Sequence, residues 1–125
     1  MKLLVKKKLV LLAIISLLAL KSMAQLEKTF LYEIHLFEKY QHRSKWTDKE
    51  YEIQKQHVSY LDSLTKKGII QLAGIVDEGL KDHKGIIILS TNSYQEAKKI
   101  ALEDPSVKKG MMNVSIHPIH IYFKR

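Results

Sequence analysis

The chain has 125 residues, with 21 Lys and Arg against 13 Asp and Glu, and it contains no cysteine. The lack of cysteine excludes disulfides and any metal or cluster held by thiolates. Five lysines and no acids lie in residues 1–24, so residues 25–125 carry 16 basic against 13 acidic side chains. That net charge of +3 is typical of an ordinary solvated surface. It argues against nucleic acid as a partner, because a nucleic-acid-binding protein carries a basic patch.

The N-terminal segment has the three parts of an export signal. Four lysines lie within the first eight residues, and residues 9–20 are apolar apart from one serine. Ser22-Met23-Ala24 then places small residues at the positions that a signal peptidase recognises. We therefore predict a signal peptide over residues 1–24, an exported protein that is periplasmic or secreted, and no membrane attachment after cleavage. The alternative is an uncleaved anchor, although Lys21 ends the apolar run short of the roughly 20 residues that span a bilayer.

Residues 25–125 contain no internal repeat and no Pro/Gly-rich linker, which predicts a single domain. Apolar residues recur at every second position of residues 30–37, which predicts a strand with both faces partly covered. Residues 38–46 are polar and are predicted to form a loop.

The next element is predicted to be a helix from Thr47 to about Lys67. Thr47 and Glu50 have the spacing of a capping box, in which each side chain satisfies a backbone N–H of the other residue. Gly68 supplies the left-handed residue that ends many helices. One stripe of this helix has the helical spacing of a buried face and includes a histidine; its members are Ile53, His57, Leu61 and Leu64.

The following two strands are predicted to form a hairpin. Residues 69–76 and 85–90 are rich in isoleucine and leucine, and residues 77–84 between them are rich in turn-forming residues.

The last part of the chain is predicted to form a helix and a strand. Ser93 and Glu96 repeat the capping-box spacing, and Asp104-Pro105 ends the helix because the residue before proline disfavours helical geometry. Residues 111–123 are predicted to form a long last strand. Pro118 within it favours an edge position or a bulge.

This order, βαββαβ, predicts an α+β, ferredoxin-like fold. A four-stranded antiparallel sheet would carry two helices on one face and leave the other face open. We expect Leu, Ile and aromatic side chains on that open face. Since a monomer rarely exposes so large an apolar patch, we expect a homodimer formed through it, a dimeric α+β barrel.

His57 and Asp104 are the candidate catalytic residues. Histidine titrates near neutrality, so a partly buried one beside a carboxylate is suited to proton transfer. The alternative is a core histidine that is hydrogen-bonded and serves only packing. Asp104 could be the carboxylate, or a turn residue that only caps a helix. The sequence alone does not place the end of the second helix beside the middle of the first.

The other candidates are weaker. His117 and His120 have a zinc-like spacing, but residues three apart on a strand point to opposite faces, so we expect no metal there. His35 lies on the first strand and could line a cleft or the dimer face. The sequence has no Gly-rich phosphate loop and no Ser or Cys nucleophile signature, and we expect no cofactor. Loop residues could form a lid over a ligand or a solvated surface: His42, Arg43 and Trp46. His83 lies in the predicted hairpin loop and receives no role.

Two segments resemble the YciI-like (YCII-related) family. The first runs from His57-Val-Ser-Tyr-Leu61 to the strand that ends in Ala73-Gly74. The second contains Asp104-Pro105, Gly110 and the strand segment Val114-Ser-Ile-His-Pro118. The resemblance covers about residues 30–123, and its specificity lies in the ordered set of motifs.

The resemblance implies a ferredoxin-like fold assembled as a dimer with its sheets facing, and a His–Asp pair in a cleft that falls here on His57 and Asp104. A few relatives are assigned acid–base elimination chemistry on small cyclic or aromatic compounds, whereas most have no known reaction. Ile75 departs from the pattern, because many members have proline after Ala-Gly. The long polar loop and the export signal depart from it as well.

We therefore expect an exported small-molecule enzyme that uses His57 and Asp104 for acid–base chemistry. The alternative is a non-catalytic homodimeric module that binds a small organic ligand or serves a structural role. The enzyme requires the two side chains to lie within hydrogen-bond reach and to face a pocket. A histidine sealed from solvent and bonded only to backbone would exclude it.

Overall fold

A computed structural model gives the fold and describes residues 1–22, 27–76, 78 and 84–125. The chain begins with a long helix, α1 (Lys2–Ser22). The elements that follow, with η denoting short 3₁₀ turns, are β1 (Lys28–Leu36), η1 (Glu38–Tyr40), η2 (Arg43–Lys45), α2 (Asp48–Lys66), β2 (Ile70–Val76), β3 (Lys84–Thr91), α3 (Tyr94–Glu103), α4 (Pro105–Lys108) and β4 (Met112–Ile119).

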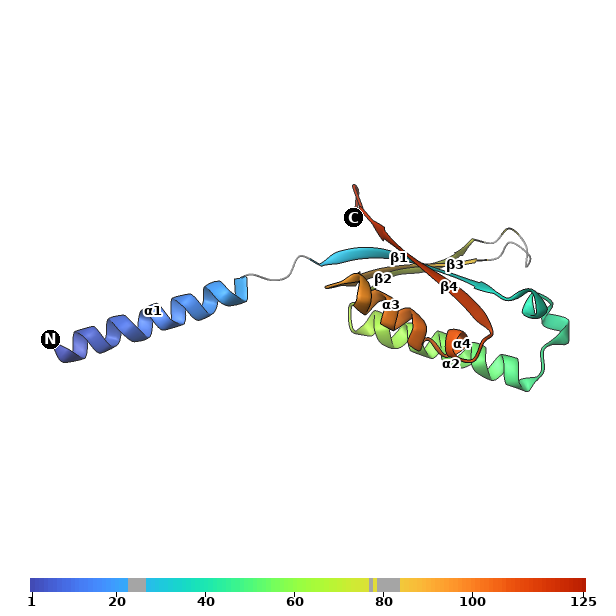
Figure 1. Cartoon of the computed structure of the whole chain (residues 1–125), viewed down its shortest axis with the longest axis horizontal. Helices are drawn as coiled ribbons and strands as arrows, with labels where there is room; N and C mark the ends of the chain where they lie inside the picture. The colour runs from blue at the N-terminus through green and yellow to red at the C-terminus, as the bar shows by residue number, and fades with distance from the viewer. Residues whose placement is uncertain (23–26, 77, 79–83) are drawn as a thin grey trace.

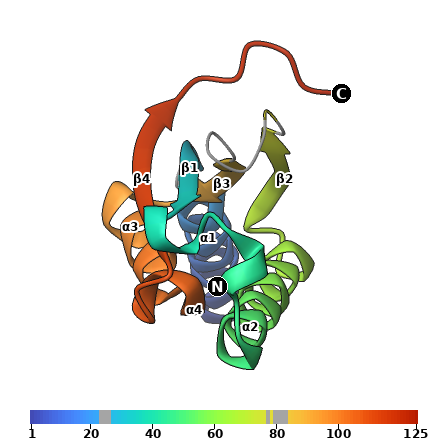
Figure 2. The ribbon, with the colours of Figure 1, turned by 90° about the vertical axis from the view of Figure 1, so that its right-hand side faces the viewer.

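The four strands form one sheet in the order β2-β3-β1-β4. Every neighbouring pair is antiparallel. Helices α2, α3 and α4 lie on the same face of the sheet, as Figures 1 and 2 show from two directions. The predicted ferredoxin-like α+β fold is therefore confirmed, and so are the predicted hairpin of β2 with β3 and the edge position of the proline-containing strand β4.

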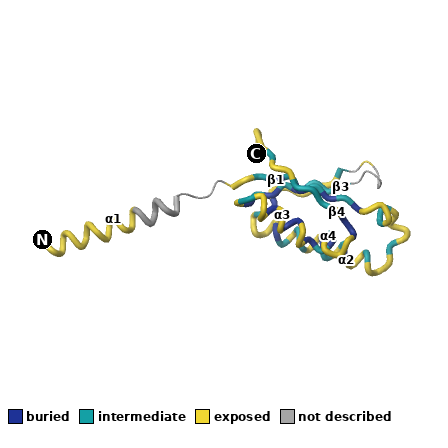
Figure 3. Tube along the Cα trace, viewed as in Figure 1, coloured by how far each residue is buried: buried dark blue, intermediate teal, exposed yellow. Residues whose placement is uncertain are grey.

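The core lies between the sheet and its helices (Figure 3). Along β1, buried side chains alternate with partly exposed ones, so one face of this central strand packs against the helices. The helices contribute small and branched apolar side chains in return. Most of the core is formed by Phe30, Tyr32, Ile34, Leu36, Ile53, Leu64, Ile87, Leu89, Ala97, Ile100 and Met111.

The predicted ends of α2 are confirmed. Thr47 and Glu50 form the capping box, in which the Thr47 N–H donates to Glu50 Oε2 at 2.8 Å. At the other end Gly68 has a φ of +76°, a conformation that glycine adopts without a steric penalty. These two ends fix which residues of α2 turn toward the sheet.

Other local predictions were only partly right. The box at Ser93 is half formed, because the Glu96 carboxylate accepts from the backbone N–H of Asn92. Residues 105–108 form the short helix α4, an element that was not predicted between the end of the second helix and the last strand. β4 ends at Ile119 rather than Phe123; Ile119 pairs with Thr29, close to the first residue of β1, and among the described residues no strand pairs with residues 120–123. Residues 38–46 contain two 3₁₀ turns.

The open face, meaning the side of the sheet opposite the helices, is apolar only in part. Leu72, Ile88 and Leu31 lie side by side in one row across β2, β3 and β1. A polar part lies next to them, where Lys84 Nζ is 3.6 Å from Glu33 Oε1. Among the described strand residues, none of the expected aromatic side chains lies on this face, because alternation along β1 turns Phe30 and Tyr32 into the core.

The C-terminal strap, residues 120–125, leaves β4 at one edge of the sheet and passes over the open face toward β2 (Figure 2). There Lys124 Nζ donates to Gln71 Oε1 at 2.6 Å. The side chains of Tyr122 and Phe123 are 86% and 95% exposed. The strap therefore crosses the sheet without burying its two aromatic rings.

Helix α1 lies apart from the sheet and its helices (Figure 1). Among the described residues, no helix combines the length and the apolar character that crossing a bilayer demands. Two sequence predictions fall outside the described residues: the cleavage site at Met23-Ala24, and most of the predicted link 77–84, which includes His83.

Candidate active site

His57 lies in the middle of α2, on the buried stripe that the sequence predicted. The residue is 7% exposed. Its Nδ1 atom lies 2.8 Å from Asp104 Oδ2 and 2.9 Å from Oδ1. The structure therefore brings together the two residues that the sequence singled out but could not place.

Asp104 is fully buried at the junction of α3 and α4. Its Oδ1 accepts from the Ser106 backbone N–H at 2.9 Å, so it is the N-cap of α4. Pro105 occupies the first helical position, where a missing N–H leaves no helical hydrogen bond unmade. Asp104 therefore caps a helix, but capping is not its whole role in the structure, because the same carboxylate also contacts His57.

Two hydroxyl groups complete the surroundings of this carboxylate. The Tyr32 hydroxyl, from β1, donates to Asp104 Oδ2 at 2.8 Å. The Ser106 hydroxyl donates to Oδ1 at 2.7 Å. Strand β1 and helices α2 and α4 therefore meet at one buried carboxylate, which fixes its position from several sides.

Hydrogen bonds and charge decide the ionisation of this cluster. Burial by itself would raise the pKa of Asp104, but the hydrogen bond and attraction from His57, with hydrogen bonds from Ser106 and Tyr32, hold that pKa below its usual value. The pKa of Tyr32 is raised far above its usual value by burial, and further by the charge of Asp104 and the hydrogen bond to it. Burial and nearby carboxylates raise the pKa of Tyr60 to about 12. Asp104 is thus ionised at neutral pH, and both tyrosines are protonated.

An ionised carboxylate can only accept hydrogen bonds, so it selects one tautomer of the ring. With Asp104 as acceptor, Nδ1 of His57 carries a proton and Nε2 of the neutral ring holds a lone pair. Within the described structure, the hydrogen-bond contacts of His57 are all made by Nδ1. Nε2 is therefore the nitrogen left for a bound molecule.

Ser106 completes the residue types of a hydrolase triad but not its geometry. Its Oγ lies 3.3 Å from His57 Nδ1, the same nitrogen that contacts Asp104, and it is fully buried. A nucleophilic serine would instead contact the ring nitrogen opposite the carboxylate and face the substrate. Ser106 therefore positions the carboxylate and does not attack a substrate.

His57 also lines a small cavity of about 70 Å³. One water needs about 10–15 Å³ of such space, so this cavity admits only a small group. Apolar side chains form much of its wall, and Arg43 and Gln54 add polar groups. The lining residues are Ile34, His35, Leu36, Arg43, Trp46, Gln54, His57, Ile75, Gly85 and Met112.

The polar loop supplies two of these lining residues. Trp46 Nε1 donates to the Tyr40 backbone oxygen at 2.8 Å, and the Trp46 ring packs edge-on against Tyr51 at 5.3 Å between centroids. The Arg43 guanidinium carbon lies 5.3 Å from the centre of the Trp46 ring. Of the three loop residues considered, Arg43 and Trp46 reach the cavity of His57 and His42 does not.

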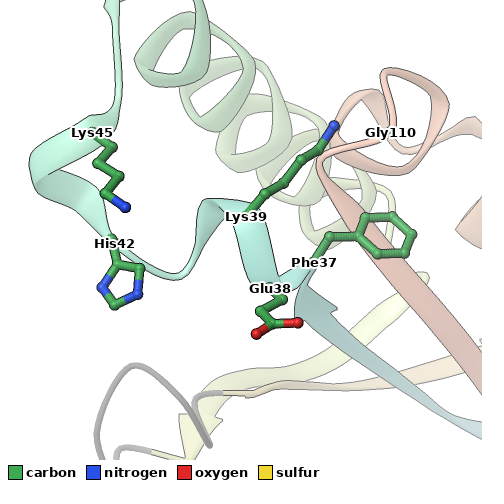
Figure 4. Close-up of a pocket in the computed structure, with 6 residues that line it drawn as sticks. All are labelled: Phe37, Glu38, Lys39, His42, Lys45 and Gly110. Atoms are coloured by element: carbon green, nitrogen blue, oxygen red, sulfur yellow. The ribbon is translucent and has the colours of Figure 1, made fainter.

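His42 lines a different, open hollow of about 940 Å³, shown in Figure 4. Its walls come from the turns η1 and η2, from the residue before each turn, and from the second residue after α4; they consist of Phe37, Glu38, Lys39, His42, Lys45 and Gly110. This hollow is wider than the cavity of His57, but its basic side chains lie on the surface and it contains neither His57 nor Asp104. The small cavity is therefore the candidate site.

The remaining histidines do not join this site as a metal centre. His117 pairs in register with Leu31 on the open face, and its Nε2 lies 3.1 Å from Ser115 Oγ. His120 lies beyond the end of β4. Among the described residues, no group of three or more His, Asp or Glu side chains is arranged to hold a metal ion.

Sequence reasoning missed three residues of the site. Tyr32 occupies a core position of the predicted strand, Ser106 directly follows the Asp-Pro pair, and Gln54 precedes His57 by three residues on one helix face. The spacing of Gln54 was a usable signal. Nothing local could show that Tyr32 reaches a carboxylate 72 positions away.

Residues 33–120 match the family described as YCII-related domain, which covers most of the predicted domain. No curated protein matches the chain. The matched range contains His57, Asp104 and Ser106, whereas Tyr32 lies just before it.

Proposed function

Since the chain belongs to the YCII-related domain family, we propose that it is an acid–base enzyme acting on a small organic molecule, with His57 moving the proton. One observation carries this proposal. His57 Nδ1 is held at 2.8 Å by the Asp104 carboxylate, and the same residue lines a cavity. A histidine placed between a buried carboxylate and a cavity has the geometry of a general base.

The proposed step is a reversible proton transfer. Nε2 of the neutral ring takes a proton from the bound molecule, and the ring becomes a cation beside the Asp104 carboxylate. Asp104 stays ionised, holds the ring in place and stabilises that positive charge. The proton then returns to the molecule at another atom or to a leaving group, which restores the neutral ring.

The alternative is a non-catalytic homodimeric binding or structural module. One observation favours it: the Asp104 carboxylate already accepts from Tyr32 and Ser106, so the cluster would also serve as a buried link between β1, α2 and α4. The same contacts would then stabilise the domain without any proton transfer.

The proposal includes export and dimerisation. The positive start, the apolar run and the small residues before Gln25 support removal of residues 1–24 and a periplasmic or secreted protein. The apolar row on the open face supports a homodimer formed through that face.

Nuclear magnetic resonance of ring-labelled His57 tests the proposal without a known substrate. The neutral ring is expected to carry its proton on Nδ1 near pH 7, and a proton on Nε2 instead would exclude the proposed base. A panel of small organic compounds in D₂O then reports catalysis through exchange of acidic C–H protons. His57→Gln should slow this exchange by roughly 100-fold or more. His120→Gln, which alters an exposed histidine outside the cavity, should leave it unchanged.

A further inference from the structure

The walls of the His57 cavity indicate which class of molecule it takes. Its lining includes three buried apolar residues, Ile34, Leu36 and Met112. Ile75, the residue that replaces the family's proline, also lines it. A bound molecule therefore has an apolar body, because a polar one would lose its hydration there without gaining partners.

The permanent charge at this cavity is positive. It belongs to the Arg43 guanidinium, which stays protonated. None of the described residues that line the cavity is acidic, and Asp104 lies behind the His57 ring. Among the described residues, Arg43 belongs to none of the ion pairs. The cavity thus offers a guanidinium to an anion from outside the chain.

The position of Arg43 is prepared before any ligand arrives. Its guanidinium packs over the Trp46 ring, which is itself held by the Tyr40 carbonyl and the Tyr51 ring. A cation over an aromatic face keeps its hydrogen-bond donors free at its edge. A carboxylate can therefore bind the planar fork in two places.

Gln54 adds a second polar group to the lining of the cavity. Its Oε1 is buried and has no hydrogen-bond partner among the described residues. Turning this carboxamide toward the cavity therefore breaks no hydrogen bond of Oε1. The amide can then donate to the same anion through Nε2.

Resting on the proposed function, we infer that the substrate is a small carboxylate with an apolar body, and that Arg43 is the residue that receives its carboxylate. His57 Nε2 then faces the carbon skeleton rather than the charged group. An inorganic phosphate would fit less well, because the apolar wall offers it no partners.

The test uses two probes of nearly the same size and shape, propanoate and its neutral isostere propanamide, with inorganic phosphate as a third. Titration of the full domain, followed by nuclear magnetic resonance shifts of the cavity residues, should show propanoate binding about tenfold more tightly than propanamide. Arg43→Gln should bring this ratio close to one. Lys45→Gln, a cation of the same turn that lines the other hollow, should leave it unchanged.

Three results would overturn the inference. Propanoate could bind no more tightly than propanamide, the two variants could lower its affinity equally, or phosphate could bind as tightly as propanoate. The outcome is separable from that of the proposed function. If propanoate is preferred in an Arg43-dependent way but His57 carries its proton on Nε2, only the proposed base is rejected. If His57 carries its proton on Nδ1 but propanoate is not preferred, only the proposed ligand class is rejected.

Discussion

Asp104 shows how one buried charge can be stable in a small domain. Burying a carboxylate is unfavourable unless hydrogen bonds and an opposite charge replace its hydration. Here Tyr32, His57 and Ser106 supply these contacts from three elements. The residue that caps α4 is thereby also the residue that orients His57, so the fold and the proposed chemistry depend on the same atoms.

The pKa of Asp104 gives the first prediction. Because this pKa is lower in the folded than in the unfolded chain, the folded state binds fewer protons and acid favours unfolding. The stability that ionised Asp104 contributes is fully present above the ordinary carboxyl pKa of about 4. It is lost as the pH falls through the lower folded-state value.

Asp104→Asn should therefore lower the free energy of unfolding by about 2 kcal/mol at pH 7. The gap to the wild-type protein should begin to shrink below about pH 4, where the unfolded wild-type chain takes up a proton on this carboxyl, and should keep shrinking as the pH falls through the lower folded-state pKa. Urea unfolding at several pH values measures this. A gap that stays constant down to pH 3 would show that the ionisation of Asp104 does not contribute.

A second prediction concerns the tyrosines. Tyr32→Phe removes a buried hydrogen bond to a charged group and should cost about 1.5–3 kcal/mol. Tyr60→Phe is the matched control, because its hydroxyl donates at the same 2.8 Å to the neutral backbone oxygen of Ile100 and should cost only about 1 kcal/mol. Equal losses in urea unfolding would contradict a special role for the Asp104 carboxylate.

At the scale of the elements, the approach of β3 to β1 shapes the cavity. Gly85 lies opposite Ile34, and a Cβ at Gly85 would come within 2.6 Å of Ile34 Cγ2. No real Cβ contact is so short, so an alanine must push Ile34 into the core or the cavity. Glycine at this position therefore allows β3 to pair closely with β1 while Ile34 keeps its place in the cavity wall.

Gly85→Ala should accordingly destabilise the domain by about 1–3 kcal/mol through overpacking. Gly74→Ala is the control: it lies on the neighbouring strand β2, and an added Cβ would meet nothing within 4 Å. Thermal or urea unfolding of both variants decides the matter. Similar free energies of unfolding for the two variants would mean that the Ile34 side chain shifts without destabilising the domain.

The elements could be predicted because their signals are local. Each of these signals involves only a few neighbouring residues: the spacing of Thr47 and Glu50, the glycine at position 68 that adopts a positive φ, and the alternation along β1. The site could be predicted only as two separate residues. Contact between His57 and Asp104 depends on how α2 and α4 pack against one sheet. A periodic pattern within one element gives no information about the distance between two elements. The end of β4 was missed for the same reason, since a partner strand decides it.

At the scale of the whole molecule, the open face and the C-terminal strap must be considered together. The apolar row of Leu31, Leu72 and Ile88 lies on this face, and the strap passes over it to reach Gln71. Tyr122 and Phe123 stay exposed in this position. A second copy seated on the face would cover the row and offer those rings a surface on which to pack.

Ile88→Glu tests this arrangement, because Ile88 lies between Leu31 and Leu72 in the middle of the row. Sedimentation velocity should show a dimer for the wild-type domain and a monomer for the variant, since two buried unpaired carboxylates would face each other in a symmetric interface. Val58→Glu places the same charge on the exposed side of α2 and should stay dimeric. A monomeric wild type, or dissociation of both variants alike, would remove the open face as the interface. In that case the C-terminal strap alone would cover the open face, held there by the hydrogen bond from Lys124 to Gln71.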